Sequence, residues 1–181
     1  MSLVQLRSRG ILDGTISAGD LASGVGGKVL QVVSTTKTDT FSASASSPNF
    51  SDVTGLSVSI TPNSASNKIL VLASYNLSAD TNDFTYSRLV RGSTAVFIGD
   101  ASTNRVLASN MCQENSGNTG VAGSINVMFL DSPSTTSSTT YKIQACTTGG
   151  VVYVNRSGRD SASTVSDGRF ASSITAIEIA V

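Results

Sequence analysis

The stretch from residue 55 to residue 77, GLSVSITPNSASNKILVLASYNL, constrains the fold more than any other part of the chain. Its first half alternates apolar and polar residues strictly, which predicts a strand with one buried and one wet face. The inward-facing residues would be Leu56, Val58 and Ile60. Pro62 then breaks the run, because proline has no amide proton to give to a ladder. Residues 68–75 predict a second strand, and we expect the two to form a hairpin.

The second strand of this pair is apolar on both faces. One face would hold Ile69, Val71, Ala73 and Tyr75. Leu70 and Leu72 lie on the opposite face, which a half-buried strand would leave polar. A strand that is apolar on both faces must be buried on both. One face packs in the core of the chain, and in a chain of 181 residues we expect the other to pack against another copy of the same chain. Leu70 and Leu72 are therefore predicted subunit-interface residues.

The charge balance excludes several classes of partner. Twelve Lys and Arg residues balance twelve Asp and Glu residues, so no excess positive charge is available for nucleic acid or an anionic membrane. No apolar run is long enough to span a bilayer and no secretion signal opens the chain, so we expect synthesis in a cytoplasm and exit only by lysis or as part of a particle. Without a secretion signal, Cys112 and Cys146 are expected to be free thiols.

Residues 1–27 differ from the rest of the chain. Leu3, Val4 and Leu6 form a small apolar cluster, and six glycines follow between Gly10 and Gly27. Glycine at this density argues against a stable independent fold. The segment is either a flexible leader or a mostly irregular anchor, and as an anchor it would use Leu3, Val4 and Leu6 to dock on another protein or within a multimer.

Residues 28–181 carry strand patterns at near-regular spacing and no convincing long helix. Further strands are expected at residues 29–33, 84–90, 95–98, 105–109, 124–130, 140–146, 151–154 and 173–181. Glycine-containing turns at residues 91–94 and 147–150 predict hairpins. About nine or ten short strands in one domain are typical of a two-sheet, jelly-roll-like β-sandwich, and the fold class is all-β.

The residue types leave little room for catalysis. The chain has no histidine, which excludes histidine triads and histidine general bases, and only two glutamates. The aspartates stand beside Gly, Asn, Ser or Thr, where their side chains usually close turns. Asp80 and Asp83 lack the regular spacing of a calcium loop. We expect no enzyme activity, no cofactor and no metal.

The densest charged cluster combines Arg156, Arg159 and Arg169 with Asp160 and Asp167. Such a cluster could bind an acidic sugar, form salt bridges with a neighbouring subunit or simply face solvent. Arginine is enriched at interfaces, whereas exposed ion pairs contribute little stability. We therefore assign Arg156, Arg159 and Arg169 to a predicted subunit interface.

Five segments together resemble a domain found in tail-fibre and other virion structural proteins of bacteriophages, particularly marine and cyanobacterial phages. They read GKVLQVVSTTKTDTFS, DVTGLSVSITPNSASNKILVLAS, LVRGSTAVFIGDA, NVMFLDSPSTTSSTTYKIQ and YVNRSGRD. The leader ILDGTISAGDLASG is similar to the connectors that precede fibre heads. The resemblance covers residues 28–181. It implies a trimeric β-structure at a fibre tip or particle surface, and it assigns no catalytic residue.

The combined expectation is a short trimeric tail fibre, part of a virion assembled in a host cytoplasm. It would dock on another virion protein through Leu3, Val4 and Leu6 at its N-terminus and contact the host surface, where a glycan is a possible ligand. Receptor contacts are expected on loops at the end opposite the leader. The candidate residues are Gln113, Glu114, Asn115 and Asn118, with residues 80–83 as a second loop. A capsid decoration or cement protein without a receptor role is the alternative. A polysaccharide-degrading enzyme is the weakest, because no acidic pair is evident.

Overall fold

The computed structural model of this chain describes residues 28–80, 83–113 and 121–181, and it folds them into β-strands, turns and loops, with no helix in these ranges. The strands are β1 (Val29–Lys37), β2 (Phe41–Ala43), β3 (Ser51–Ile60), β4 (Lys68–Ala79), β5 (Phe84–Arg91), β6 (Thr94–Val96), β7 (Asn110–Gln113), β8 (Gly123–Asp131), β9 (Thr139–Thr147), β10 (Val152–Val154) and β11 (Ser172–Ile179). The leader prediction for residues 1–27 lies outside these residues, and the head domain 28–181 stays a prediction that this fold accommodates.

The strands pair from the outside of the sequence inward. β1 pairs with β11, β3 with β9, β4 with β8 and β5 with β7, all antiparallel. The chain is therefore one long antiparallel hairpin, with its tip at residues 97–109, rolled into two sheets. That winding is the jelly roll. The predicted jelly-roll-like β-sandwich is confirmed.

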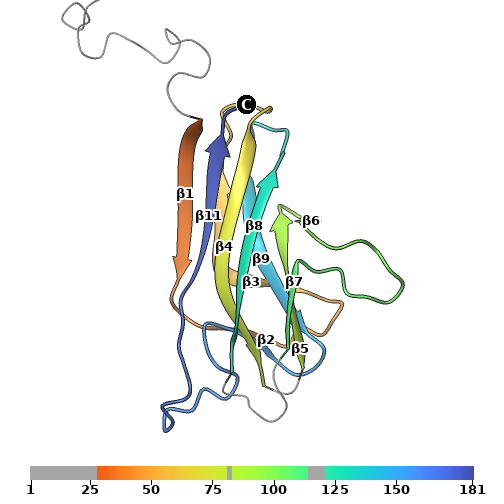
Figure 1. The fold of residues 1–181 in the computed structure, drawn as a ribbon, viewed down its shortest axis with the longest axis vertical. Coiled ribbons are helices and arrows are strands. Elements are labelled where there is room, and N and C mark those ends of the chain that lie inside the picture. Colours follow the sequence, from red (N-terminus) through yellow and green to blue (C-terminus); the bar gives the residue numbers. More distant parts are fainter. Residues whose placement is uncertain (1–27, 81–82, 114–120) are drawn as a thin grey trace, which may run out of the picture.

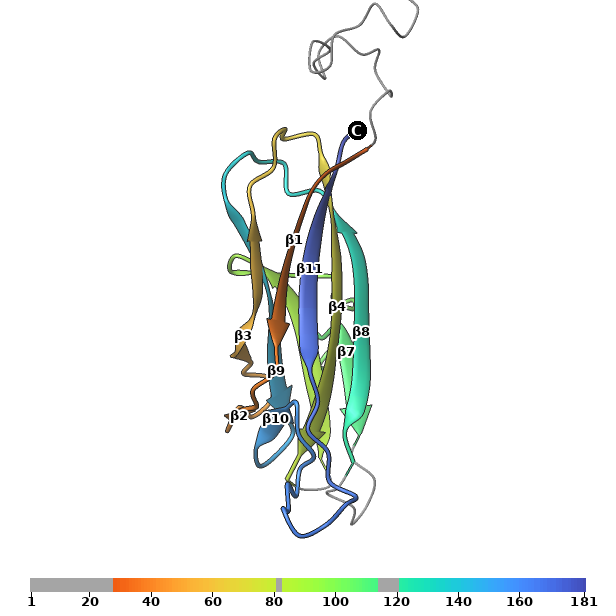
Figure 2. The same ribbon diagram turned by 90° about the vertical axis from the view of Figure 1, so that its left-hand side faces the viewer.

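Two sheets form the layers. Sheet A contains β1, β11, β4 and β8, which stand side by side in Figure 1, and is extended at one end by β10 and β2. Sheet B contains β3, β9, β5, β6 and β7. Figure 2 shows the sandwich edge-on, with β3 and β9 on one side and β11, β4 and β8 on the other. Only one face of each sheet can thus reach the shared core.

The core lies between the sheets and is built from the residues whose alternation predicts it. Leu56, Val58 and Ile60 of β3 are buried, and so are Ile69, Val71, Ala73 and Tyr75 of β4. Two tyrosine hydroxyls inside the sandwich are satisfied. That of Tyr75 shares a 2.8 Å hydrogen bond with Ser87, and that of Tyr141 donates to Asp131 at 2.6 Å. The inward faces of both strands are therefore confirmed.

Two of the three predicted hairpins are wrong. β3 and β4 belong to different sheets, and so do β9 and β10, so each connection crosses from one layer to the other. Alternation identifies the buried face of a strand but not the strand it pairs with, and a crossing between sheets leaves the same pattern. The hairpin of β5 and β6 is confirmed, and Gly92 turns it with a positive φ of 59°.

Two short strands escape the sequence patterns. β2 lies in a Ser/Thr-rich stretch expected to be a loop, and β7 occupies residues 110–113 whereas the expected strand at 105–109 is irregular.

The position of β7 also shows whether the two cysteines can form a disulfide. Cys112 pairs in register with Thr85 and Cys146 with Tyr86. Consecutive residues of β5 face opposite sides, so the two thiols lie on opposite faces of sheet B and do not form a disulfide.

Candidate functional site

The sandwich has two chemically different ends. The proximal end is formed by residue 28, where the described chain begins, together with residues 61–67, 131–139 and 180–181. The distal end carries residues 80 and 83, the turn 148–151 and the loop 155–171, all at the bottom of Figures 1 and 2. The backbone amide of Ala180 donates to the carbonyl of Lys28 at 2.7 Å, which joins the first and last described segments at the proximal end.

The expected receptor loops start from the distal end. Gln113 is the exposed last residue of β7 and pairs in register with Phe84 at the start of β5. Glu114, Asn115 and Asn118 lie outside the described residues. The placement of Gln113 opposite residue 28 agrees with the expected geometry, and the receptor role of all four residues stays a prediction.

The predicted arginine cluster forms the long distal loop 155–171. The Arg159 guanidinium makes a forked contact with Asp167, the shorter arm 2.7 Å, and Arg169 makes a second fork with Asp160 at 2.6 Å. Arg156 stacks on the Tyr153 ring at 4.0 Å and donates to the carbonyls of the loop. These arginines hold their own loop in shape, and their predicted interface role stays untested.

The Arg159–Asp167 fork has a clear electrostatic signature. The Arg159 guanidinium is the main cause of a lowered Asp167 pKa, and a backbone hydrogen bond from Ser161 acts in the same direction. Asp160, Asp167 and Arg169 border a shallow polar groove of about 280 Å³ with Ser161, Thr164 and Gly168. Since its charges are already paired, this groove offers mainly hydroxyl groups and backbone to a ligand.

Asp80 and Asp83 both hydrogen-bond to the neighbouring turn 148–151. Asp80 accepts a 2.8 Å hydrogen bond from the amide of Val151, and Asp83 accepts one of 2.9 Å from the Thr148 hydroxyl. Gly150, at a φ of 67°, leaves room for the Asp80 carboxylate that a Cβ would occupy. In the described ranges no group of three or more metal-ligating side chains comes together.

The outer face of sheet A places Leu70 and Leu72 in a wide apolar surface. Strand register aligns Val32, Ile177, Leu70 and Leu130 in one row across β1, β11, β4 and β8. The next row is Ser34, Thr175, Leu72 and Met128. The six apolar residues of these rows, together with Leu30 and Ile179, form what we call the apolar band. Leu70 and Leu72 thus lie where the sequence predicts, within a surface four strands wide.

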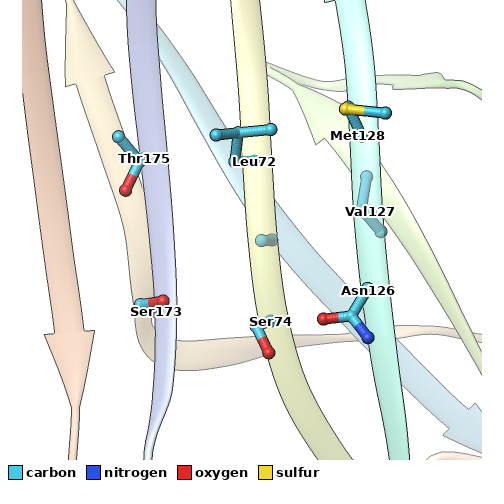
Figure 3. A pocket seen from close by; sticks show the side chains of 8 residues that line it. Leu72, Ser74, Asn126, Val127, Met128, Ser173 and Thr175 are labelled. Carbon is cyan, nitrogen blue, oxygen red and sulfur yellow. The ribbon is translucent and has the colours of Figure 1, made fainter.

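The apolar band is open to solvent. Leu30 is 44% exposed, Val32 57%, Leu130 54% and Met128 72%, while the remaining members are half-buried by their neighbours. A shallow groove of about 620 Å³ crosses its lower border, where Leu72 and Met128 give way to Ser74, Asn126 and Ser173 (Figure 3). Contiguous exposed apolar surface of this kind marks interaction sites more often than chance.

A buried carboxylate stabilises the proximal end. Glu178 of β11 is fully buried and accepts hydrogen bonds from Gln31, Asn67 and the amide of Asn63, at 2.6–2.7 Å. Burial alone would raise the Glu178 pKa, but these donors outweigh it and hold the pKa below its ordinary value. The residue ties β11 to β1 and to the β3–β4 connection.

A second buried carboxylate joins the two sheets. Asp131 at the end of β8 accepts from both Arg91 of β5, at 2.8 Å, and Tyr141 of β9. Burial, followed by the hydrogen bond to Asp131, raises the Tyr141 pKa. The sequence suggests only a turn for Asp131, because Ser132 and Pro133 follow it, and no local signal identifies partners forty and ten residues away.

Comparisons with known proteins do not assign this chain to a family. No protein-family model matches the chain, and no curated protein does. One solved structure, titled "Structure of infectious bursal disease virus Gx strain", is similar with a TM-score of 0.39 and 11% identity over 82% of this chain and 37% of that chain. The chain thus spans little more than a third of that protein, and a likeness this distant carries no functional argument. The residues that the structure describes include no helix long and apolar enough to cross a membrane.

Proposed function

We propose that this chain is a structural protein of a virus particle, anchored at the proximal end of its jelly roll and displaying the distal loops outward. One observation carries the proposal. The described chain begins at the proximal end, whereas the end of β4, the start of β5, the end of β7 and the loop 155–171 lie at the distal end. A rigid sandwich with its attachment and its long loops at opposite ends is suited to presenting those loops.

The more specific form of the proposal is a short trimeric tail fibre, or its tip, that contacts the host surface. The resemblance of residues 28–181 to phage tail-fibre domains supports it. Three copies on one axis would bring three sets of distal loops to the same side, and multivalent contacts multiply weak single-site affinities.

The chemistry of the distal end favours a hydroxyl-rich glycan as the receptor class. The arginines and aspartates of loop 155–171 are paired with each other, so the loop presents little unpaired charge. It carries the exposed residues Ser163 and Ser166 and the half-buried Thr164, whose hydroxyls can both donate and accept hydrogen bonds to sugar hydroxyls.

A capsid decoration protein is the second candidate, favoured by the apolar band. Such a protein would lay a broad uncharged face on the particle. Gold labelling of this chain on intact particles separates the two: label at the tail supports the fibre, and label over the capsid supports the decoration role.

Deleting residues 1–27 tests the anchor. We expect the remaining chain to fold, with an unchanged circular dichroism spectrum, and to be missing from purified particles. Normal incorporation of the shortened chain would contradict docking through Leu3, Val4 and Leu6.

Replacing Gln113, Glu114, Asn115 and Asn118 together by alanine tests the receptor role of the first distal loop. We expect reduced adsorption of particles to host cells, with particle assembly and melting temperature unchanged. A matched triple variant in the other loop, Ser163→Ala with Thr164→Val and Ser166→Ala, shows which distal loop contributes. Unaltered adsorption in both variants would contradict host contact through the distal end.

A further inference from the structure

We infer that the outer face of sheet A is the contact surface for a second copy of this chain, with the two copies packed face to face and parallel. The inference is made from the surface alone, so it does not depend on the virion role. A face-to-face pair closes as a dimer, and this arrangement is therefore an alternative to the trimer proposed above. It names a partner, a face and an orientation.

The first argument is the shape of the apolar surface. The residues of the row Val32, Ile177, Leu70 and Leu130 are direct cross-strand neighbours, so their side chains form a continuous strip across all four strands. Strand edges and loops do not interrupt it. A continuous strip on a flat sheet is complementary to another such strip, as the inner faces of the two sheets of a sandwich are.

The second argument is charge. Among the outward-facing residues of β1, β11, β4 and β8, the only charged side chain is Lys68, at the proximal rim, where it donates to Ser132 at 2.7 Å. A charged partner would find no counter-charge on this face. A second copy would meet a surface as uncharged as its own, and the chain as a whole has no net charge to repel it.

The third argument is size. Strands lie about 4.8 Å apart and rise about 3.3 Å per residue, so four strands of some nine residues present a face of roughly 20 by 30 Å. That projected area of about 600 Å² is close to the roughly 800 Å² that each partner buries in a stable interface. The face is therefore large enough for a stable contact between copies.

The orientation follows from the change of character along the strands. The apolar band occupies the proximal half, and the row Thr36, Ser173, Ser74 and Asn126 begins a polar half that continues to Asn76. Parallel copies match apolar to apolar and polar to polar at every height. An antiparallel pair centred on the face would place the apolar band of each copy against the hydroxyl and amide groups of the other.

Charge insertion tests the surface. Val32→Glu and Leu130→Glu each place a carboxylate in the apolar band at a site exposed enough to leave the fold intact. Met111→Glu is the matched control, because Met111 is 55% exposed on the outside of sheet B. By sedimentation equilibrium on the full chain we expect wild type and Met111→Glu to associate equally, and the two band variants to associate at least about 100-fold more weakly.

Several results would overturn the inference. Band variants that associate like wild type would place the contact elsewhere. A full-length chain that stays monomeric at micromolar concentration would leave the face to residues 1–27 or to another virion protein. Unchanged circular dichroism of the band variants ensures that weaker association does not come from unfolding.

Cysteine cross-linking tests the orientation. Leu70 and Asn76 both lie on β4, one of the two central strands across the width of the face, and are about 20 Å apart along that strand. In parallel copies each single variant, Leu70→Cys or Asn76→Cys, should be joined to its own equivalent by a short bis-maleimide reagent, because sheets packed face to face lie about 10 Å apart, too far for a direct disulfide. Cross-links that form only when the two variants are mixed would show an antiparallel pair and refute the parallel arrangement. The parent chain, treated with the same reagent, measures any background from Cys112 and Cys146.

Discussion

The outer faces of the two sheets differ in how their side chains are satisfied. On sheet B, Asp52 accepts from Lys142 at 2.7 Å and from Gln144 at 2.6 Å. Arg88 donates to the same Gln144 at 2.8 Å and lies 4.1 Å above the Phe50 ring. Charged and amide groups thus link β3, β9 and β5 across the surface.

Sheet A has an equally regular backbone but a different outer surface. Its proximal half offers apolar side chains, and its distal half offers hydroxyl and amide groups. Water solvates the outer face of sheet B well and the apolar band of sheet A poorly. The comparison teaches that the two outer faces of one sandwich can differ fully in chemistry, paired charges on one sheet and exposed apolar side chains on the other.

The largest difference is expected between two neighbouring residues that lie on opposite faces of β4. Ile69 is fully buried in the core, whereas its neighbour Leu70 belongs to the apolar band. Ile69→Ala should lower the free energy of unfolding by about 3 kcal/mol, because it leaves a cavity. Leu70→Ala should cost the isolated chain about 1 kcal/mol or less but weaken association. Urea unfolding and sedimentation measure the two effects, and an equal loss of stability in both would contradict the distinction.

The next largest effect concerns the contact between the sheets. Asp131→Asn removes the charge that pairs with Arg91 while keeping the shape of the side chain. We expect a loss of roughly 2 kcal/mol in urea unfolding, because Arg91 is left partly buried without its counter-charge. Arg91→Met, which removes the other charge, should lose a similar amount, and the double variant less than the sum. Additive losses would show that the two groups do not interact.

A smaller effect should appear on acidification. Because the folded Glu178 pKa lies below its ordinary value of 4.5, the carboxylate contributes stability above that pH and loses it as the pH falls further. Glu178→Gln should cost roughly 1.5 kcal/mol at neutral pH, from weaker hydrogen bonds, and should flatten the acid limb of a melting-temperature profile. A profile identical to wild type would exclude this carboxylate as the cause.

The smallest effect belongs to the solvated face. Asp52→Ala should lower stability by at most about 1 kcal/mol, since its ion pair with Lys142 is half-exposed and screened by salt. Association should not change. If Asp52→Ala weakened association as much as a charge in the apolar band, sheet B would be the contact surface instead.

The fold was predictable where one strand carries its own signal. Alternation in β3, β4 and β8 identifies their inward faces, and the double apolarity of β4 correctly places Leu70 and Leu72 outside the core. Strand partners were not predictable, because pairing in a jelly roll joins strands far apart in the sequence, as β3 pairs with β9 through Ser51 and Ala145. The hairpins expected for β3–β4 and β9–β10 fail for this reason.

The candidate sites were predictable to the same limit. The outward placement of Gln113 follows from its position in a polar, glycine-rich stretch. The sequence shows that Arg159 and Asp167 are near neighbours, but not that they pair with each other instead of with a partner. Glu178 and Asp131 carry no local signal, because the donors that make their burial possible come from other strands.

The pairing of the first long strand with the last has a mechanical consequence. Residues 28 and 180 are hydrogen-bonded at the proximal end, so force applied between these two points would open β1 from β11 one hydrogen bond at a time, as a zip opens. Force applied between residue 28 and the distal loops runs along the strands instead. The hydrogen bonds, perpendicular to the strands, then share the load and must break together. A head of this design resists a pull between its base and its tip far better than a pull between its two terminal strands.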